Sequence, residues 1–274
     1  DLKIASWADH HGEEPPISGS RGSGTIFFSR CTMRCLYCQN YPWSQDGQGD
    51  IYSTQQLGDA FRALQTAGCH NLNLVSPTPW LPMIQEALAG ANRGPEALPV
   101  VYNTSGYERV ETLQSLEGTV NVYLTDLRYA GGESARDGSD ARDYVRVARD
   151  AWREMWRQTG PLQIDESGVA TRGTICRVLI LPGRAHEAEE TLRWLADTAG
   201  TDVPVSVMSQ YVPLHRAPDC ESWNRPISRA EHEQVSRIVE EIGFTQGWVQ
   251  DFEQQTAPEL VGHAMAPGGV ETKQ

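Results

Sequence analysis

The sequence predicts an α/β fold in which six βα units form a partial or full parallel (β/α) barrel. Short apolar runs typical of buried parallel strands alternate with segments whose apolar residues recur at helical spacing. Polar residues cluster directly after several of these runs, where a barrel of this type gathers its chemistry. The length of 274 residues is sufficient for one such barrel.

Six apolar runs predict the parallel strands, because each is short and is bounded by turn residues. They comprise residues 24–29, 71–75, 99–104, 120–126, 174–181 and 204–208. A further short strand is predicted over residues 244–249.

Amphipathic segments between these runs predict the helices of the barrel. They comprise residues 54–67, 80–91, 107–116, 141–158 and 187–199. A last helix is expected to begin after Ser228, which precedes Glu231 at capping-box spacing. Residues 131–138 instead predict a glycine-bearing loop, which we interpret as a lid hinged at Gly131 and Gly132.

The chain is expected to divide into an N-terminal extension (1–23), the barrel domain (24–250) and a loosely packed C-terminal tail (251–274). The net charge of −13 argues against a broad nucleic-acid or acidic-membrane surface. No apolar stretch approaches about 18 residues and no signal peptide opens the sequence. We therefore expect a soluble, cytoplasmic protein whose thiols stay reduced.

Three of the six cysteines stand together, as Cys31, Cys35 and Cys38. Thiolates at this spacing can each bind one iron of a cubane cluster, and no fourth cysteine lies nearby to bind the remaining iron. An open iron of this kind can chelate an amino and a carboxylate group. The alternative is a zinc site, which requires a second pair of ligands that the sequence does not supply.

A CxxxCxxC motif with an aromatic residue (Tyr37) before its last cysteine resembles the signature of the radical S-adenosylmethionine (SAM) superfamily. The surrounding GSGTIFFSRCTMRCLYCQNY is similar to pyruvate formate-lyase activating enzyme and its PflX-like relatives. The similarity continues through NLNLVSPTPWLP, VYNTSGYERVETL, VYLTDLRYA, AWREMWRQTG, RVLILPG and VSVMSQYVP, and so covers residues 4–250.

This resemblance implies a radical SAM type of barrel with a [4Fe–4S] cluster on Cys31, Cys35 and Cys38. It implies reductive cleavage of SAM to a 5′-deoxyadenosyl radical, which abstracts hydrogen from a substrate. A flavodoxin- or ferredoxin-type protein would supply the electron. Tyr37 and Asn40, within and beside the motif, are assigned to cofactor binding on the same basis.

Further cofactor contacts are implied by position in the resemblance. Ser76 and Thr78 stand where activating enzymes carry a Gly-Gly-Glu segment that holds the methionyl amino group. Asn103 and Ser105 stand where those enzymes carry Asp-Thr-Asn-Gly beside the cofactor. The alternative for both segments is a simple strand-to-helix turn with a capping hydroxyl.

Asp126 and Arg128 match the Asp-x-Lys of activating enzymes, and the alternative is a structural ion pair at the barrel rim. Arg177 lies inside an apolar strand, where an unpaired charge is costly, so it is a candidate ligand of a carboxylate if it points inward. Gln210 and Tyr211 follow the sixth strand and could cap the adenine or the substrate, although a core tyrosine is equally consistent.

Three hypotheses for the substrate remain open. The first is a glycine of a partner glycyl-radical enzyme, as for an activase. The second is a small molecule such as a sugar, with epimerisation, dehydrogenation or rearrangement; Cys176 or Cys220 would then be a hydrogen donor. The third is a non-enzymatic iron–sulfur redox protein.

Other candidate residues have simpler interpretations. Cys69, Cys176 and Cys220 are expected to be free thiols. His10 and His11 beside Glu13 and Glu14 suggest a metal pair, but a surface loop is the favoured interpretation.

Overall fold

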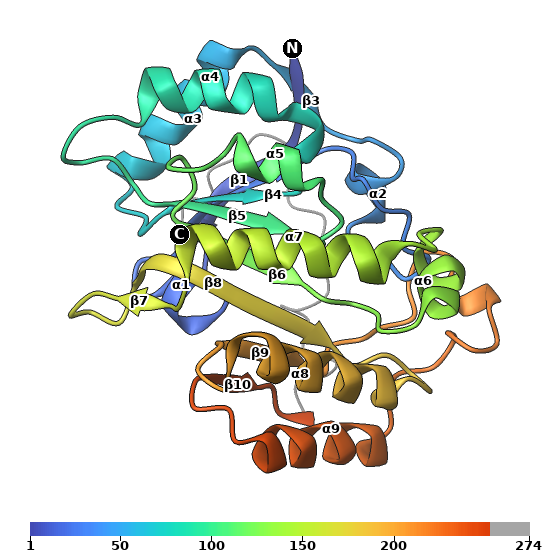
Figure 1. The fold of residues 1–274 in the computed structure, drawn as a ribbon. Coiled ribbons are helices and arrows are strands. Elements are labelled where there is room, and N and C mark those ends of the chain that lie inside the picture. Colours follow the sequence, from blue (N-terminus) through green and yellow to red (C-terminus); the bar gives the residue numbers. More distant parts are fainter. Residues whose placement is uncertain (253–274) are drawn as a thin grey trace.

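The computed structural model describes residues 1–252 and contains one largely parallel sheet (Figure 1). Neighbouring strands follow the order β10-β9-β8-β6-β5-β4-β2-β1-β3, and β7 (Gln163–Ile164) pairs with β8 alone. The first seven of these strands run parallel. They are β10 (Gly247–Val249), β9 (Val205–Met208), β8 (Ala170–Leu179), β6 (Val122–Asp126), β5 (Val100–Thr104), β4 (Leu72–Val75) and β2 (Ser23–Phe28).

These seven strands coincide with the six predicted strands and the predicted short strand after them, so the α/β prediction is confirmed. The sheet is a partial barrel, because β3 (Asp50–Tyr52) and β10 are its edges and no pairing joins them in the described residues. The sequence pattern had left open whether the barrel closes.

Helices cover the outer face of the sheet (Figure 1). They are α3 (Thr54–Thr66), α4 (Leu81–Ala91), α5 (Val110–Gln114), α7 (Tyr144–Thr159), α8 (Ala185–Ala199) and α9 (Arg229–Ile242). Each corresponds to a predicted helix, and the Ser228–Glu231 capping box of α9 is present. Within the described residues no helix has the length and apolar character needed to span a membrane.

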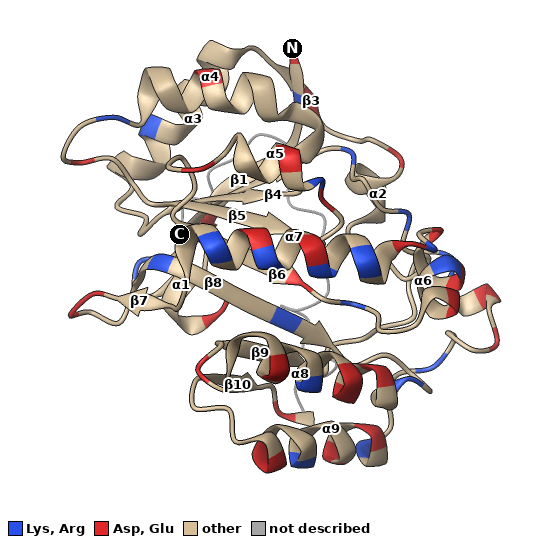
Figure 2. Ribbon diagram, viewed as in Figure 1, with Lys and Arg blue, Asp and Glu red and all other residues tan. Residues whose placement is uncertain are grey.

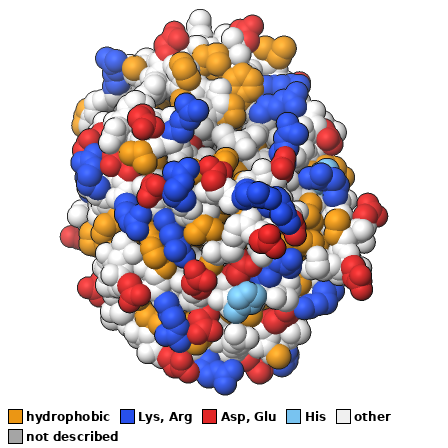
Figure 3. Space-filling view, turned by 45° about the vertical axis from the view of Figure 1, so that its right-hand side comes forward, with side chains coloured by type: hydrophobic (Ala, Val, Ile, Leu, Met, Phe, Trp, Pro, Cys, Tyr) orange, Lys and Arg blue, Asp and Glu red, His pale blue; other side chains and the backbone are white. Residues whose placement is uncertain are grey.

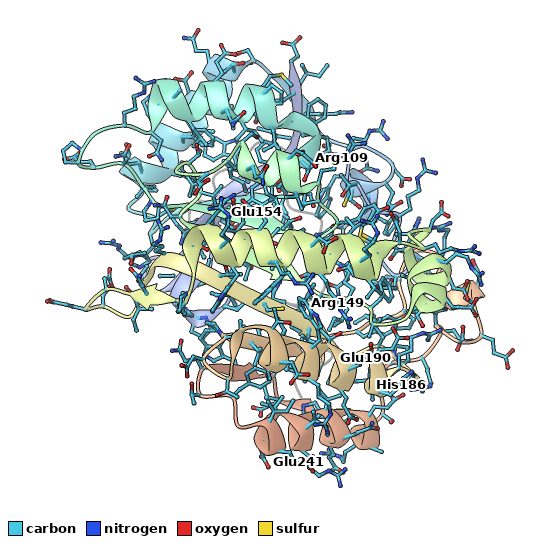
Figure 4. All side chains as sticks on the ribbon, in the orientation of Figure 1. Arg109, Arg149, Glu154, His186, Glu190 and Glu241 are labelled. Atoms are coloured by element: carbon cyan, nitrogen blue, oxygen red, sulfur yellow. The ribbon has the colours of Figure 1, made fainter. Side chains whose placement is uncertain are left out.

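Charged side chains are concentrated on the outer helices, whereas the strands carry few of them (Figure 2). Arg149 of α7 and Glu190 of α8 form an ion pair of 3.3 Å between neighbouring helices (Figure 4). On the face shown in Figure 3, positive side chains are interspersed with acidic and hydrophobic ones. The charge pattern is that of solvated helix surfaces rather than of a single-sign patch on this face.

Residues 1–23, placed by the sequence in an N-terminal extension, contribute a strand to the sheet. β1 (Leu2–His10) pairs antiparallel with β2 in a register that sets His10 opposite Ser23. β1 therefore ends beside the amino-terminal end of β2. The short helix α1 (Pro15–Ser18) follows and buries Ile17 among residues of β5, β6 and β8. This segment closes the end of the barrel opposite the strand carboxyl ends (Figure 1).

The predicted lid loop over residues 131–138 is a helix, α6 (Gly132–Ser139), so the loop prediction is wrong. Two glycines and two serines among its eight residues give α6 low intrinsic helix propensity. Tertiary packing compensates, because Ala135 and Ser139 are buried and Gly138 contacts Tyr129 and Trp223 closely. The predicted tail (251–274) lies almost entirely outside the described residues.

Candidate functional site

The three clustered cysteines lie on the loop between β2 and α2 (Tyr41–Ser44), at the carboxyl end of the parallel strands. Figure 1 shows α2 and α6 at this same end of the sheet. Backbone hydrogen bonds hold the loop from two sides: Leu36 N donates to Gly138 O, and Arg216 N donates to Leu36 O, both at 2.9 Å. Because elements distant in sequence fix the loop, its conformation depends on the complete barrel.

Each of the three thiols has a polar neighbour. Ser139 Oγ donates to Cys35 Sγ at 3.0 Å, and Ser44 Oγ lies 3.2 Å from Cys38 Sγ. Ser76 Oγ lies 3.9 Å from Cys31 Sγ. Arg128 Nη1 is 3.7 Å from Cys35 Sγ, which brings a positive charge beside that sulfur.

Burial raises the pKa of Cys31, and the Met33 backbone N–H opposes this effect. Burial, followed by the neighbouring Cys35, raises the pKa of Cys38 to about 11. The charges of Cys35 and Cys31 both contribute to this rise in the pKa of Cys38. Within residues 1–252 no three His, Cys, Asp or Glu side chains are placed to hold one metal ion.

A cavity of about 190 Å³ opens beside the cysteine loop on the inner side of the sheet. It contains most of the residues that the sequence analysis assigned to cofactor binding. Those lining it are Tyr37, Cys38, Asn40, Asn103, Asp126, Arg128, Arg177 and Gln210. Tyr211 also lines the cavity, and its hydroxyl donates to Trp223 O at 2.6 Å, so it is both a wall residue and a core residue.

Asp126, the last residue of β6, lies between two arginines. Arg128 Nη2 contacts its Oδ2 at 2.5 Å, and Arg177 Nε contacts its Oδ1 at 2.6 Å. Burial alone would raise the pKa of Asp126, but the charges of Arg177 and Arg128 outweigh it and hold the pKa below its usual value. Arg177 points into the cavity, and its charge is paired with that of Asp126.

Glu13 is a cavity residue that the sequence analysis assigned to a surface loop. Its Oε1 accepts from Asn73 Nδ2 at 3.0 Å and from Asn103 Nδ2 at 3.4 Å, while Arg177 Nη1 lies 3.4 Å from its Oε2. Burial raises the pKa of this carboxyl and the charge of Arg177 opposes the rise. Glu14 is also enclosed, and its Oε2 has no hydrogen-bond partner among the described residues.

The antiparallel pairing of β1 with β2 brings the turn that carries Glu13 and Glu14 to the inner side of the sheet. The sequence offered one weak signal: two adjacent acidic residues directly before Pro15-Pro16 and Ile17, a short segment that then proves to be buried.

Five predicted cluster or cofactor residues do not line the cavity: Cys31 and Cys35 of the motif, and Ser76, Thr78 and Ser105. Ser76 is beside Cys31 and adopts a left-handed conformation with φ of 55°. Thr78 Oγ1 donates to Glu108 Oε1 at 2.6 Å and lies 3.0 Å from Tyr102 Oη. Ser105 is buried in the turn after β5, where its carbonyl accepts from a tyrosine hydroxyl. The segment around Thr78 is thus held by Glu108, a buried carboxyl that the sequence analysis did not identify.

The remaining cysteines and histidines lie elsewhere. Cys69 and Cys176 are buried, and Cys220 is partly buried against the core. None of them lines the cavity. His11 is paired with Asp9 at 3.6 Å and His10 packs edge-on against Phe27, so the histidines and Glu13 do not form a joint metal site.

Comparison with known proteins gives relatives but no family assignment. No protein-family model matches the sequence. The chain is 27% identical over 244 residues to an uncharacterized protein, MJ0674, of Methanocaldococcus jannaschii. The match covers 86% of this chain and 66% of the relative, so the chain spans just under two thirds of that protein's length.

Solved structures of low sequence identity share the fold. The chain matches SuiB of Streptococcus suis bound to S-adenosylmethionine with a TM-score of 0.54 and 8% identity, over 84% of this chain and 50% of SuiB. It matches HydG, a maturase of the [FeFe]-hydrogenase, with a TM-score of 0.52 and 14% identity, over 80% of this chain and 48% of HydG. It matches a structure of anSMEcpe with bound AdoMet with a TM-score of 0.50 and 10% identity, over 78% of this chain and 57% of anSMEcpe.

The chain therefore spans about half the length of these proteins. The described residues share the fold of the matched parts of these three proteins, an open, largely parallel α/β barrel.

Proposed function

We propose that this protein is a radical SAM enzyme that binds a [4Fe–4S] cluster through Cys31, Cys35 and Cys38. The observation that carries the proposal is the position of the cysteine loop, at the carboxyl end of the parallel strands and directly beside a polar cavity. In barrels of this kind, reacting groups gather at that end of the strands. The fold shared with structures that contain bound AdoMet supports the same assignment.

The residues fit a cluster better than a single ion. Three neighbouring thiols without a fourth cysteine suit a cubane that keeps one iron open, since each thiolate binds a different iron. Serine hydroxyls and an arginine near the sulfurs suit the negative charge of thiolate ligands. Such a cluster would supply the electron that cleaves SAM to a 5′-deoxyadenosyl radical.

The cavity has the groups needed to hold the rest of SAM. Arg128 carries a buried Nε without a hydrogen-bond partner in the described residues, which makes it our candidate for the methionyl carboxylate. Asp126 fixes the orientation of Arg128. Gln210, Asn40 and Asn103 of the cavity lining are our candidates for the adenine and ribose. Ser76 does not line the cavity but lies beside Cys31, and it is our candidate for the methionyl amino group.

For the substrate, we propose a glycine of a partner glycyl-radical enzyme as the first class, on the basis of the resemblance to activating enzymes. A flavodoxin- or ferredoxin-type protein would deliver the electron. A small-molecule substrate is the second candidate. The positions of Cys176 and Cys220 outside the cavity count against either as the hydrogen donor of an epimerase.

The experiment is anaerobic. The protein is reconstituted with iron and sulfide, reduced with dithionite and incubated with SAM, and 5′-deoxyadenosine and methionine are assayed. Cleavage in the wild type and none in the Cys31→Ala/Cys35→Ala/Cys38→Ala variant is the expected result. A fully assembled cluster that cleaves no SAM, with candidate substrates present, would favour the redox-protein alternative. A glycyl-radical EPR signal on an added partner would identify the activase role.

A further inference from the structure

We propose that Ser139 is a positioning residue that sets the reduction potential of the cluster, at the end of a hydroxyl chain running from Tyr37 through Tyr129. The inference rests on the proposed function, because it concerns a sulfur that would bind the cluster. It assigns a role to the end of helix α6, the segment that the sequence analysis interpreted as a lid.

The chain consists of three successive contacts. Tyr37 Oη lies 2.7 Å from Tyr129 Oη, which lies 2.6 Å from Ser139 Oγ, and Ser139 Oγ donates to Cys35 Sγ at 3.0 Å. Each hydroxyl has one hydrogen to donate, and a thiolate can only accept. With Cys35 as a thiolate, Ser139 must donate to sulfur, Tyr129 to Ser139 and Tyr37 to Tyr129. All three hydroxyls therefore point their hydrogens toward Cys35.

The hydroxyl chain is shielded from solvent. Tyr37, Tyr129 and Ser139 are only 2–3% exposed, so water does not compete for these hydrogen bonds. Tyr37 is further held between rings, stacked on Trp223 at a centroid distance of 5.4 Å. In a buried environment, aligned hydrogen bonds polarise and strengthen one another.

The end of α6 is docked on the cysteine loop at two adjacent residues. Gly138 O accepts from Leu36 N at 2.9 Å, and Ser139 contacts the neighbouring Cys35. Glycine is required at position 138, because a Cβ there would lie 2.5 Å from Tyr129 Oη. The backbone of α6 thus places the Ser139 hydroxyl at a fixed distance from the sulfur.

Cys35 also receives a second, longer contact from Arg128 Nη1 at 3.7 Å. Reduction takes one electron from an external donor such as dithionite and adds one negative charge to the cluster and its thiolates, without a proton. A hydrogen bond donated to a ligand sulfur stabilises that added charge and raises the reduction potential. Removing the Ser139 hydroxyl should therefore make the cluster harder to reduce.

The test is a redox titration of the reconstituted cluster, followed by EPR and visible absorption, in the absence of SAM and substrate. We expect Ser139→Ala to lower the ratio of reduced to oxidised cluster about tenfold at a fixed poise, equivalent to about 59 mV for a one-electron couple. Tyr129→Phe keeps Ser139 but removes its donor, so a smaller shift of about twofold in the same direction is expected. Ser139→Thr retains a hydroxyl and should restore most of the wild-type potential.

Ser134→Ala is the matched control, because Ser134 lies on the same helix and its hydroxyl contacts Glu187 instead of a cysteine. It should leave the potential unchanged. Equal potentials for Ser139→Ala and Ser134→Ala, with the cluster assembled in both, overturn the inference. If Ser139→Ala assembles no cluster, the reduction potential of Tyr129→Phe tests the inference instead, and a potential equal to that of the wild type overturns it. A wild type that assembles no cluster overturns the proposed function and this inference with it, whereas an intact cluster with unshifted variants overturns the inference alone.

Discussion

Arg177 Nη1 lies 3.4 Å from Glu13 Oε2, an ion pair between residues 164 positions apart. Arg177 also bonds Asp126 and Asn103, so the N-terminal turn and the centre of the sheet share one buried polar network. The segment before the cysteine motif is therefore part of the cavity wall.

Replacing Glu13 by Gln should destabilise the protein by about 1–3 kcal/mol. The amide cannot balance the charge of Arg177, and its N–H groups would face a guanidinium that has no acceptor to offer. The free energy of unfolding in urea measures the effect. Glu133→Gln, at an exposed ion pair of α6, is the control and should change it by less than about 0.5 kcal/mol. Equal stabilities of the two variants would show that the Glu13–Arg177 pair is not important for folding.

Replacing Arg128 by Gln should weaken SAM binding about 10- to 100-fold, because a charge-assisted hydrogen bond to the carboxylate is lost. The dissociation constant is measured from the spectral change when SAM is added to the reconstituted protein. Arg146→Gln, on the exposed side of α7, should bind SAM as the wild type does. Unchanged affinity in Arg128→Gln would require another residue to hold the carboxylate.

Gly138→Ala should destabilise the protein by about 1–3 kcal/mol, because the added methyl group would approach Tyr129 Oη to 2.5 Å and Trp223 to 2.7 Å. It should also reduce cluster incorporation, measured as iron per chain after reconstitution. Gly90→Ala is the matched control, since nothing lies within 4 Å of a Cβ at that helical position. That variant should be stabilised by up to about 1 kcal/mol. If both substitutions changed the free energy of unfolding in the same direction, the tight packing assigned to Gly138 would be contradicted.

Glu231→Gln should lower stability at neutral pH but not in strong acid. Hydrogen bonds from Arg225 lower the pKa of Glu231 to about 2, against the effect of burial. The backbone N–H groups of Ser228 and Gly183 contribute to the lowering. A depressed folded-state pKa stabilises the fold above the ordinary carboxyl pKa of about 4.3, and the contribution is lost as the pH falls to about 2.

Because Arg225 is half exposed and solvent screens the pair, we expect a stability difference between wild type and Glu231→Gln on the order of 1 kcal/mol at pH 7, disappearing between about pH 4 and pH 2. Urea unfolding across this pH range measures it. Glu240→Gln on the exposed face of α9 should show no such difference. A pH-independent difference would mean that Glu231 acts through packing and not through its charge.

Local sequence determined most of the secondary structure of this protein, because the parallel strands and the longer helices follow from periodicity and from short-range caps. The Ser228–Glu231 capping box and the seven parallel strands were predicted in this way and are present. The spacing of Cys31, Cys35 and Cys38 likewise placed three thiols on one loop after a strand.

Only the tertiary structure decided which distant side chains meet at that loop. Glu13 enters the cavity because β1 pairs antiparallel with β2, and no local pattern predicts the register of two strands against each other. Ser139 reaches Cys35 because burial of Ala135 and close packing of Gly138 stabilise a helix whose own residues favour it weakly. In the described residues no pairing joins the edge strands β3 and β10, and this depends on the curvature of the whole sheet and not on any local pattern. The sequence by itself therefore determined the parallel strands, the longer helices and the cysteine loop, whereas long-range packing decided β1, α6 and the surroundings of the cysteines.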